Sequence, residues 1–185
     1  LIEQRREETI LCVDCMDVAF LAGEAEILEK FESFGSGLVV STESDGIAGL
    51  QETKVKLHQM CIAAGGYHPQ LNIGAWIGKR EYALHVFKEA ERIWRYHPVD
   101  PTYNYDVLPQ WLMEMKAWGG GPEFELDWKD VLFQSMNKAA TEVIVVDGRK
   151  RIHNLATGTL PVLLHYNGDK TYSAHREMVR YLLEG

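Results

Sequence analysis

Hydrophobic positions along the chain alternate between short continuous runs and runs with helical spacing. Continuous apolar runs predict buried strands at residues 9–13, 38–41, 71–78 and 160–165. Apolar side chains recur every three or four positions in residues 24–34 and 79–96, which predicts two amphipathic helices. This alternation of strands and helices is typical of an α/β domain.

Weaker patterns predict the remaining elements. Shorter helices are predicted at residues 52–60, at 112–118, and from Asp127 to about Met136. In the last of these, Asp127 would suit the positive end of the helix dipole. Residues 143–146 and 149–152 predict a hairpin with a type I′ turn at Asp147-Gly148. A final amphipathic helix is predicted near the C-terminal end, with Ser173 as its N-cap.

The composition excludes several classes of protein. Of the 185 residues, 46% are hydrophobic and 25% are charged, so the chain has enough apolar surface to fold and is not mainly disordered. The net charge of −8 argues against a nucleic-acid backbone as the main partner. No apolar stretch reaches the roughly 18 residues of a membrane span. Cys12 and Cys15 form a single C-x-x-C, and because Cys12 lies in an apolar run, we expect it to be a small buried hydrophobic residue.

Two carboxylates follow the first predicted strand. Asp14 and Asp17 lie at the carboxyl end of residues 9–13, which is the end of a strand where ligands bind in open α/β sheets. Two carboxylates three positions apart can converge on one divalent cation, and oxygen ligands suit Mg²⁺ or Mn²⁺. The alternative is that both are solvated turn residues.

A histidine ends the strand predicted at residues 160–165. His165 leads into a turn, and Lys170 follows shortly after it. Imidazole is a common metal ligand, and Mn²⁺ accepts a mixed site of histidine and carboxylates. Lys170 has the charge to meet a phosphate. The alternative is that His165 is only hydrogen-bonded at a strand end.

Asn72 and Asp130 are candidates for contact with a substrate. Asn72 precedes small residues, and glycine beside it lets a ligand approach the backbone. Its amide could therefore meet a sugar hydroxyl. Asp130 lies near a predicted helix start, where a carboxylate could act as a base or bind a hydroxyl. The alternatives are close packing of a strand at Asn72 and a favourable helix charge at Asp130.

The order of these segments resembles the glycosyltransferase domain of procollagen lysyl hydroxylases and related hydroxylysine glycosyltransferases. Residues 13–18 are similar to that family's metal-binding strand end, and residues 71–78 resemble its L-N-S-G-G-F-I-G segment. The other similar stretches are residues 38–43, 130–133 and 154–168, the last resembling the closing strand and its H-G-N-G turn. The resemblance spans about residues 9–170.

The resemblance implies a fold and a site. The fold would be GT-A-like, with a mixed central sheet flanked by helices. Residues 1–185 would form the C-terminal portion of one such domain, without its N-terminal βαβ part. Mn²⁺, or Mg²⁺ in its place, would be held by Asp14, Asp17 and His165 and would clamp a UDP diphosphate. Asn167, Gly168 and Lys170 would bind the nucleotide sugar, and Asn72 and Asp130 would line the sugar or acceptor side.

The resemblance also implies an activity. A metal-dependent enzyme would move a hexose from a UDP-sugar to a hydroxyl acceptor, such as hydroxylysine of a collagen-like protein, in the endoplasmic reticulum or Golgi lumen. Lys129 stands where the family has an acidic residue, and Tyr166 stands where it has a small one. These departures leave open a degenerate GT-A-like domain that acts as a binding module. A second alternative is a metal-dependent phosphoester hydrolase, since Asp and His also build such sites.

Overall fold

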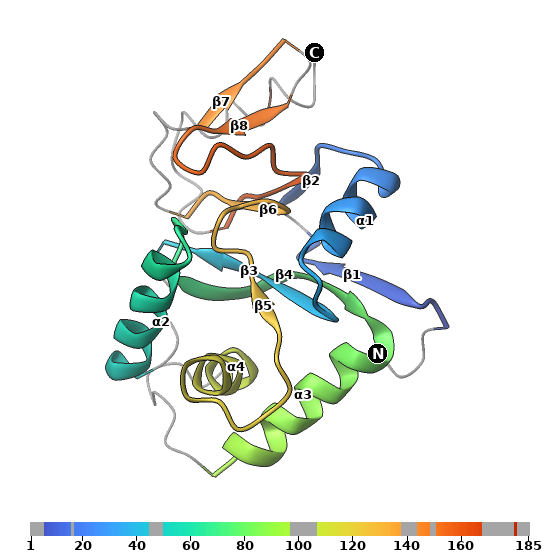
Figure 1. Ribbon diagram of the computed structural model, residues 1–185. Coiled ribbons are helices and arrows are strands. Elements are labelled where there is room, and N and C mark those ends of the chain that lie inside the picture. The colour runs from blue at the N-terminus through green and yellow to red at the C-terminus, as the bar shows by residue number, and fades with distance from the viewer. Residues whose placement is uncertain are drawn as a thin grey trace.

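The computed structural model describes residues 6–15, 17–44, 50–96, 107–137, 144–148, 151–167 and 180. The strands are β1 (Thr9–Val13), β2 (Val18–Phe20), β3 (Leu38–Glu43), β4 (Gln70–Lys79), β5 (Glu125–Leu126), β6 (Phe133–Ser135), β7 (Ile144–Val146), β8 (Ile152–Asn154) and β9 (Leu163–His165). The helices are α1 (Glu24–Ser33), α2 (Gln51–Ala63), α3 (Arg80–Trp94) and α4 (Val107–Trp118). Figure 1 shows how these elements are arranged.

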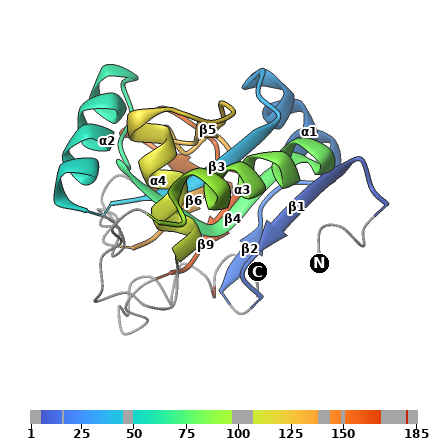
Figure 2. The same ribbon diagram turned by 90° about the horizontal axis from the view of Figure 1, so that it is seen from below.

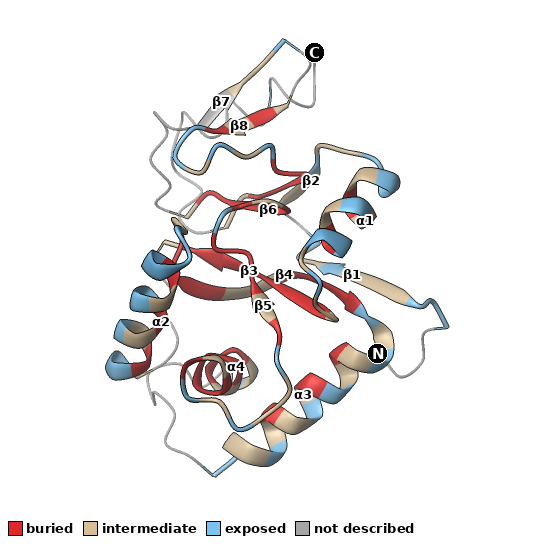
Figure 3. Ribbon diagram, in the orientation of Figure 1, coloured by how far each residue is buried: buried red, intermediate tan, exposed pale blue. Residues whose placement is uncertain are grey.

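Four strands form a mixed sheet in the order β1-β4-β3-β5. β4 is antiparallel to both β1 and β3, whereas β5 is parallel to β3. Leu38, Val39 and Val40 of β3 are completely buried (Figure 3). A strand that is covered on both faces has no solvated side, and this is why β3 is a continuous apolar run in the sequence.

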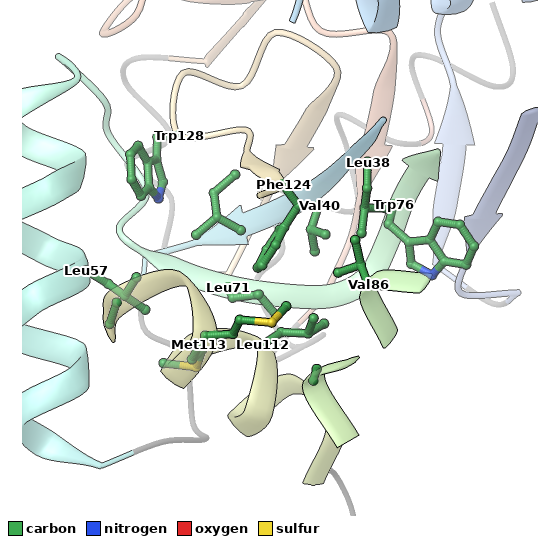
Figure 4. Packing of buried hydrophobic residues seen from close by; sticks show 14 of the residues in the cluster. Leu38, Val40, Leu57, Leu71, Trp76, Val86, Leu112, Met113, Phe124 and Trp128 are labelled. Atoms are coloured by element: carbon green, nitrogen blue, oxygen red, sulfur yellow. The ribbon is translucent and has the colours of Figure 1, made fainter. Parts of the chain in front are cut away.

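Alternate residues of β3 contribute to two hydrophobic clusters. Leu38 and Val40 pack with side chains of α2, α3 and α4, as the close view in Figure 4 shows. Val39 packs with side chains of α1, β6 and β9. Three helices therefore cover one face of the sheet, and α1 with a second sheet covers the other (Figures 1 and 2).

The second sheet has three short strands in the order β2-β9-β6. β2 is antiparallel to β9, and β6 is parallel to it. β7 and β8 form a separate antiparallel hairpin. The expected α/β class, with a mixed central sheet flanked by helices, is confirmed.

The helix predicted from Asp127 to about Met136 is wrong. This segment is a turn followed by strand β6. The Asp127 carboxylate accepts the backbone N–H groups of Val131, Leu132 and Phe133, each at 2.8 Å. Asp130 adopts a left-handed backbone with φ of 53°. An acidic residue that ties three following N–H groups into a turn gives the same sequence pattern as a helix start.

The predicted type I′ turn of the hairpin is also wrong. Val146 pairs with Ile152, so the loop between β7 and β8 is longer than two residues. The N–H of Asp147 donates to the carbonyl oxygen of Arg151 at 2.9 Å, and Arg151 N–H donates back to Oδ1 of Asp147. Apart from residue 180, the helix predicted after Ser173 falls outside the described residues.

Candidate functional site

Asp14, Asp17 and His165 come together where the two sheets meet. Asp14 directly follows β1 of the four-stranded sheet, Asp17 directly precedes β2, and His165 ends β9 of the three-stranded sheet. Their ligand atoms all lie within 4.8 Å of one another. Nε2 of His165 is 3.3 Å from Oδ2 of Asp14 and 3.7 Å from Oδ1 of Asp17. The structure thus brings together the three side chains that the sequence indicated as metal ligands, and metal binding itself stays a prediction.

Backbone contacts fix these three positions. Val18 pairs with His165 in the β2–β9 ladder, so Asp17 and the imidazole are neighbours. The N–H of Tyr166 donates to the carbonyl oxygen of Asp17 at 2.6 Å. The N–H of Asp14 donates to the carbonyl oxygen of Gly74 in β4 at 2.8 Å. The trio is therefore held by β1 and β4 of one sheet and by β2 and β9 of the other.

The trio is open to solvent on one side. The side chain of His165 is 1% exposed and that of Asp17 is 14% exposed, whereas that of Asp14 is 59% exposed. The imidazole forms the floor of the site, and Asp14 forms its rim. A ligand can approach from the side of Asp14.

The residues present fit a divalent cation. Two carboxylates and one imidazole make a donor set that suits Mn²⁺, and three protein ligands leave coordination positions for oxygen atoms of a substrate. The glycine at position 74 leaves space between Asp14 and His165. A Cβ at this position would lie 2.5 Å from Oδ2 of Asp14 and closer still to Cε1 of His165. A larger residue would occupy the space between the ligands.

Asn72 borders the same site. Its Oδ1 accepts the N–H of Gly74 at 2.8 Å. The same Oδ1 would lie 2.9 Å from a Cβ on Gly74, which places the amide on the Gly74 side of the trio. The structure therefore brings Asn72 to the candidate site, with its side-chain oxygen already bonded.

Asp130 does not line an open cleft, which corrects that expectation. It is completely buried, and its Oδ1 is 3.0 Å from Nδ1 of His68. Its Oδ2 accepts Nδ2 of Asn154 at 2.8 Å. Burial raises the pKa of Asp130, and the hydrogen bond and charge of His68 oppose that rise. In this conformation, Asp130 holds its turn against the segment between α2 and β4 and against β8, rather than reaching a substrate.

Asn167 joins the two sheets. Its Nδ2 donates to Oε2 of Glu43 at 2.7 Å, and its Oδ1 accepts the hydroxyl of Ser135 at 2.8 Å. The same Oε2 of Glu43 accepts Nδ2 of Asn137 at 2.8 Å. The predicted nucleotide-binding residue Asn167 therefore has its amide engaged by protein groups, while Gly168 and Lys170 lie outside the described residues.

Two residues of this region were not found from the sequence: Glu43 is only 7% exposed and carries the contact between the sheets, and His68 bonds the buried Asp130. Gly74 was expected to let a ligand approach the backbone, and it leaves space between the side chains of the trio. A glutamate that ends an apolar strand was the one available signal for Glu43. Nothing in the local pattern distinguishes His68.

The expectation for Cys12 is wrong. Cys12 and Cys15 are both exposed and free. β1 is the edge strand of its sheet, so one side of Cys12 has no neighbouring strand among the described residues. Partial burial and the neighbouring Asp14 carboxylate raise the pKa of the Cys12 thiol. A raised pKa keeps this thiol protonated near neutral pH.

Comparison with known proteins supports the resemblance. No known protein-family profile matches the sequence. The chain is 31% identical over 169 residues to the multifunctional procollagen lysine hydroxylase and glycosyltransferase LH3 of Homo sapiens, and equally identical to that of Pongo abelii. It is 27% identical over 175 residues to procollagen-lysine,2-oxoglutarate 5-dioxygenase 1 of Gallus gallus. In each case the match covers 89% of this chain and 21% of the relative.

Among the described residues, no helix combines the length and the hydrophobicity needed to cross a membrane.

The mixed α/β architecture agrees with a GT-A-like segment of a lysyl hydroxylase glycosyltransferase domain. The match covers most of this chain, and the relatives are enzymes by name. The chain is therefore homologous to a segment, about a fifth in length, of the procollagen lysyl hydroxylases and glycosyltransferases.

Proposed function

We propose that this chain carries the cation centre of a glycosyltransferase that moves a hexose from a UDP-sugar to hydroxylysine of a collagen-like protein. The observation that carries the proposal is the convergence of Asp14, Asp17 and His165 at one solvent-open point. The names of the relatives, which include a multifunctional procollagen lysine hydroxylase and glycosyltransferase, support the reaction class and the acceptor.

The transfer requires charge to be stabilised on the leaving group. The bond between the anomeric carbon and the diphosphate oxygen breaks, and its electron pair leaves with UDP. The acceptor hydroxyl oxygen bonds to the anomeric carbon, and its proton is released to the surrounding water. Asp14, Asp17 and His165 would hold Mn²⁺ or Mg²⁺, which would supply a Lewis acid for the negative charge that develops on the diphosphate.

The chain's own residues would divide the remaining tasks. Asp14, Asp17 and His165 would hold the cation, and the exposed side of Asp14 would admit the diphosphate. Asn72 would offer its Nδ2 to a sugar hydroxyl, since its Oδ1 is bonded to Gly74. We assign Gly168 and Lys170 to the diphosphate side because of the family resemblance. Asp130 would stabilise the turn before β6.

A panel of UDP-sugars tests this proposal on the full-length protein. UDP release is measured with Mn²⁺, with Mg²⁺ and with EDTA, in the presence and absence of a hydroxylysine peptide. We expect Mn²⁺-dependent release that requires the peptide. Asp17→Asn should lower the rate by at least 100-fold, because a lost ligand removes several kcal/mol of transition-state stabilisation. Glu29→Gln, at an exposed position of α1, should behave as wild type.

The same assay separates the alternatives. UDP release that does not require an acceptor would indicate a hydrolase rather than a transferase. Binding of UDP without turnover of any donor would indicate a domain that only binds. Release that is unchanged in EDTA would contradict a cation centre at Asp14, Asp17 and His165.

A further inference from the structure

Next to the candidate cation centre, the register between β4 and β3 is interrupted, while β4 stays paired with β1. Val40 of β3 pairs with Trp76, but Thr42 pairs with Leu71. Ser41 alone on β3 therefore stands opposite residues 72–75 of β4. Such a bulge bends a strand and redirects its backbone, and bulges occur often beside functional sites.

A chain of hydrogen bonds connects this bulge to a predicted cation ligand. Oδ1 of Asn72 accepts the N–H of Gly74 at 2.8 Å. The carbonyl oxygen of Gly74 accepts the N–H of Asp14, also at 2.8 Å. The position of Asp14 therefore depends on the Gly74 backbone, which Asn72 holds.

The space at Gly74 sets how closely the ligands can approach each other. An added Cβ would contact Oδ2 of Asp14 at 2.5 Å and Cε1 of His165 at a shorter distance. One of these two side chains would have to move. Because the two atoms belong to different sheets, their separation also depends on how the sheets meet.

We propose that Asn72 and Gly74 are positioning residues for the cation centre. This inference rests on the cation centre of the proposed function and adds what determines its geometry. The Asn72 side chain holds the N–H of Gly74, and the carbonyl oxygen of Gly74 holds the N–H of Asp14. Because glycine has no side chain, position 74 leaves room for the cation. The bond from Gly74 N–H also fixes the orientation of the Asn72 amide, since only the oxygen can accept it.

Mn²⁺ affinity measured on the full-length protein tests this proposal. The dissociation constant is obtained by electron paramagnetic resonance of free Mn²⁺, with no nucleotide present. Asn72→Leu keeps the approximate volume and removes the acceptor, and we expect affinity to fall by about 10- to 100-fold, as for other residues that orient metal ligands. Asn72→Ser retains an oxygen that can accept the N–H two residues on, and should recover most of the affinity.

Gly74→Ala should also weaken Mn²⁺ binding by at least tenfold. The matched control is Gly23→Ala, since a Cβ on Gly23 meets nothing within 4 Å and Gly23 has an extended backbone. Urea unfolding in EDTA gives the stability of each variant without metal. A structural effect alone would lower that stability and leave the affinity of the folded fraction unchanged.

The Mn²⁺ affinities of these variants support or overturn the positioning role of Asn72 and Gly74. Wild-type Mn²⁺ affinity in Asn72→Leu or Gly74→Ala would overturn the positioning role and leave the cation centre standing. Equal losses in Asn72→Ser and Asn72→Leu would overturn the role of the hydrogen bond, whether or not Asn72→Leu folds well. Absence of Mn²⁺ binding by the wild-type protein would overturn both this inference and the cation centre itself.

Discussion

Two aspartates three positions apart, Asp127 and Asp130, are completely buried in the turn between β5 and β6. Burial and the neighbouring Asp130 carboxylate raise the pKa of Asp127 to about 7, although three backbone N–H bonds oppose the change. An unfolded aspartate has a pKa of about 3.9. Between these two values the folded state binds more protons than the unfolded state, so folding is linked to pH.

We predict that Asp127 makes the free energy of unfolding fall as the pH rises from about 4 to about 7. The contribution is fully present below the unfolded pKa and is lost as the pH passes through the raised folded pKa. Urea unfolding at several pH values checks this, with Asp127→Asn as comparison. The difference between the two proteins should change by on the order of a few kcal/mol over this range, and parallel pH profiles would contradict it.

A second residue-scale prediction concerns His68. Its ring is buried and lies 3.0 Å from Oδ1 of Asp130, so His68→Phe leaves a buried carboxylate with one partner fewer. We expect a loss of about 1–3 kcal/mol in the free energy of unfolding, measured with urea. His58→Phe, on the exposed side of α2, should change it by less than about 0.5 kcal/mol. Similar values for the two variants would mean that the His68 contact contributes no stability.

At the scale of elements, the contact between the two sheets depends on the end of β3. Oε2 of Glu43 accepts both Asn137 and Asn167, and Asn167 lies just beyond β9. This contact connects the strand that ends with His165 to the centre of the larger sheet. The ends of β3 and β9 are therefore joined by polar side chains.

We predict that Glu43→Ala lowers the free energy of unfolding by about 1–3 kcal/mol, because the half-buried amides of Asn137 and Asn167 lose this acceptor. Glu43→Gln should cost less, since an amide oxygen can still accept both donors. Thermal unfolding followed by circular dichroism compares the two. If glutamine proves as costly as alanine, the negative charge rather than the accepting oxygen makes the contribution.

The elements predicted correctly and incorrectly differ in length and in burial. α1 and α3 were predictable because one face of each packs on a sheet, and β3 because both its faces are covered. β2, β5 and β6 have two or three residues each, too few for any period to appear. Asp14 and His165 were predicted from strand ends and family resemblance, but the Val18–His165 register that joins them is a long-range pairing. The local sequence pattern does not indicate which distant strand will pair with β2.

At the scale of the molecule, the candidate centre connects the two sheets. Asp14 belongs to the end of β1, whereas Asp17 and His165 flank the β2–β9 ladder. A cation held by all three would act as a crosslink between the sheets. Its binding free energy would then contribute to the stability of the whole described fold.

We predict that Mn²⁺ raises the free energy of unfolding by about 2.7 kcal/mol when free Mn²⁺ is 100 times its dissociation constant. The increase should disappear in EDTA and in Asp17→Asn, and should remain in Glu29→Gln. Differential scanning calorimetry over a Mn²⁺ titration measures it. A melting temperature that does not depend on Mn²⁺ would contradict a centre that binds only the folded chain.

The short link between β1 and β2 also has a consequence for the order of folding. The chain leaves one sheet after Val13 and enters the other at Val18, yet the partner of Val18 in the ladder is His165. During synthesis, Asp14 and Asp17 leave the ribosome long before His165. β2 therefore cannot form its ladder until β9 has been synthesised. Pairings between such distant segments form slowly. If the candidate centre binds an ion, it would therefore do so late in biogenesis, because a nascent chain stalled before β9 would carry Asp14 and Asp17 without His165.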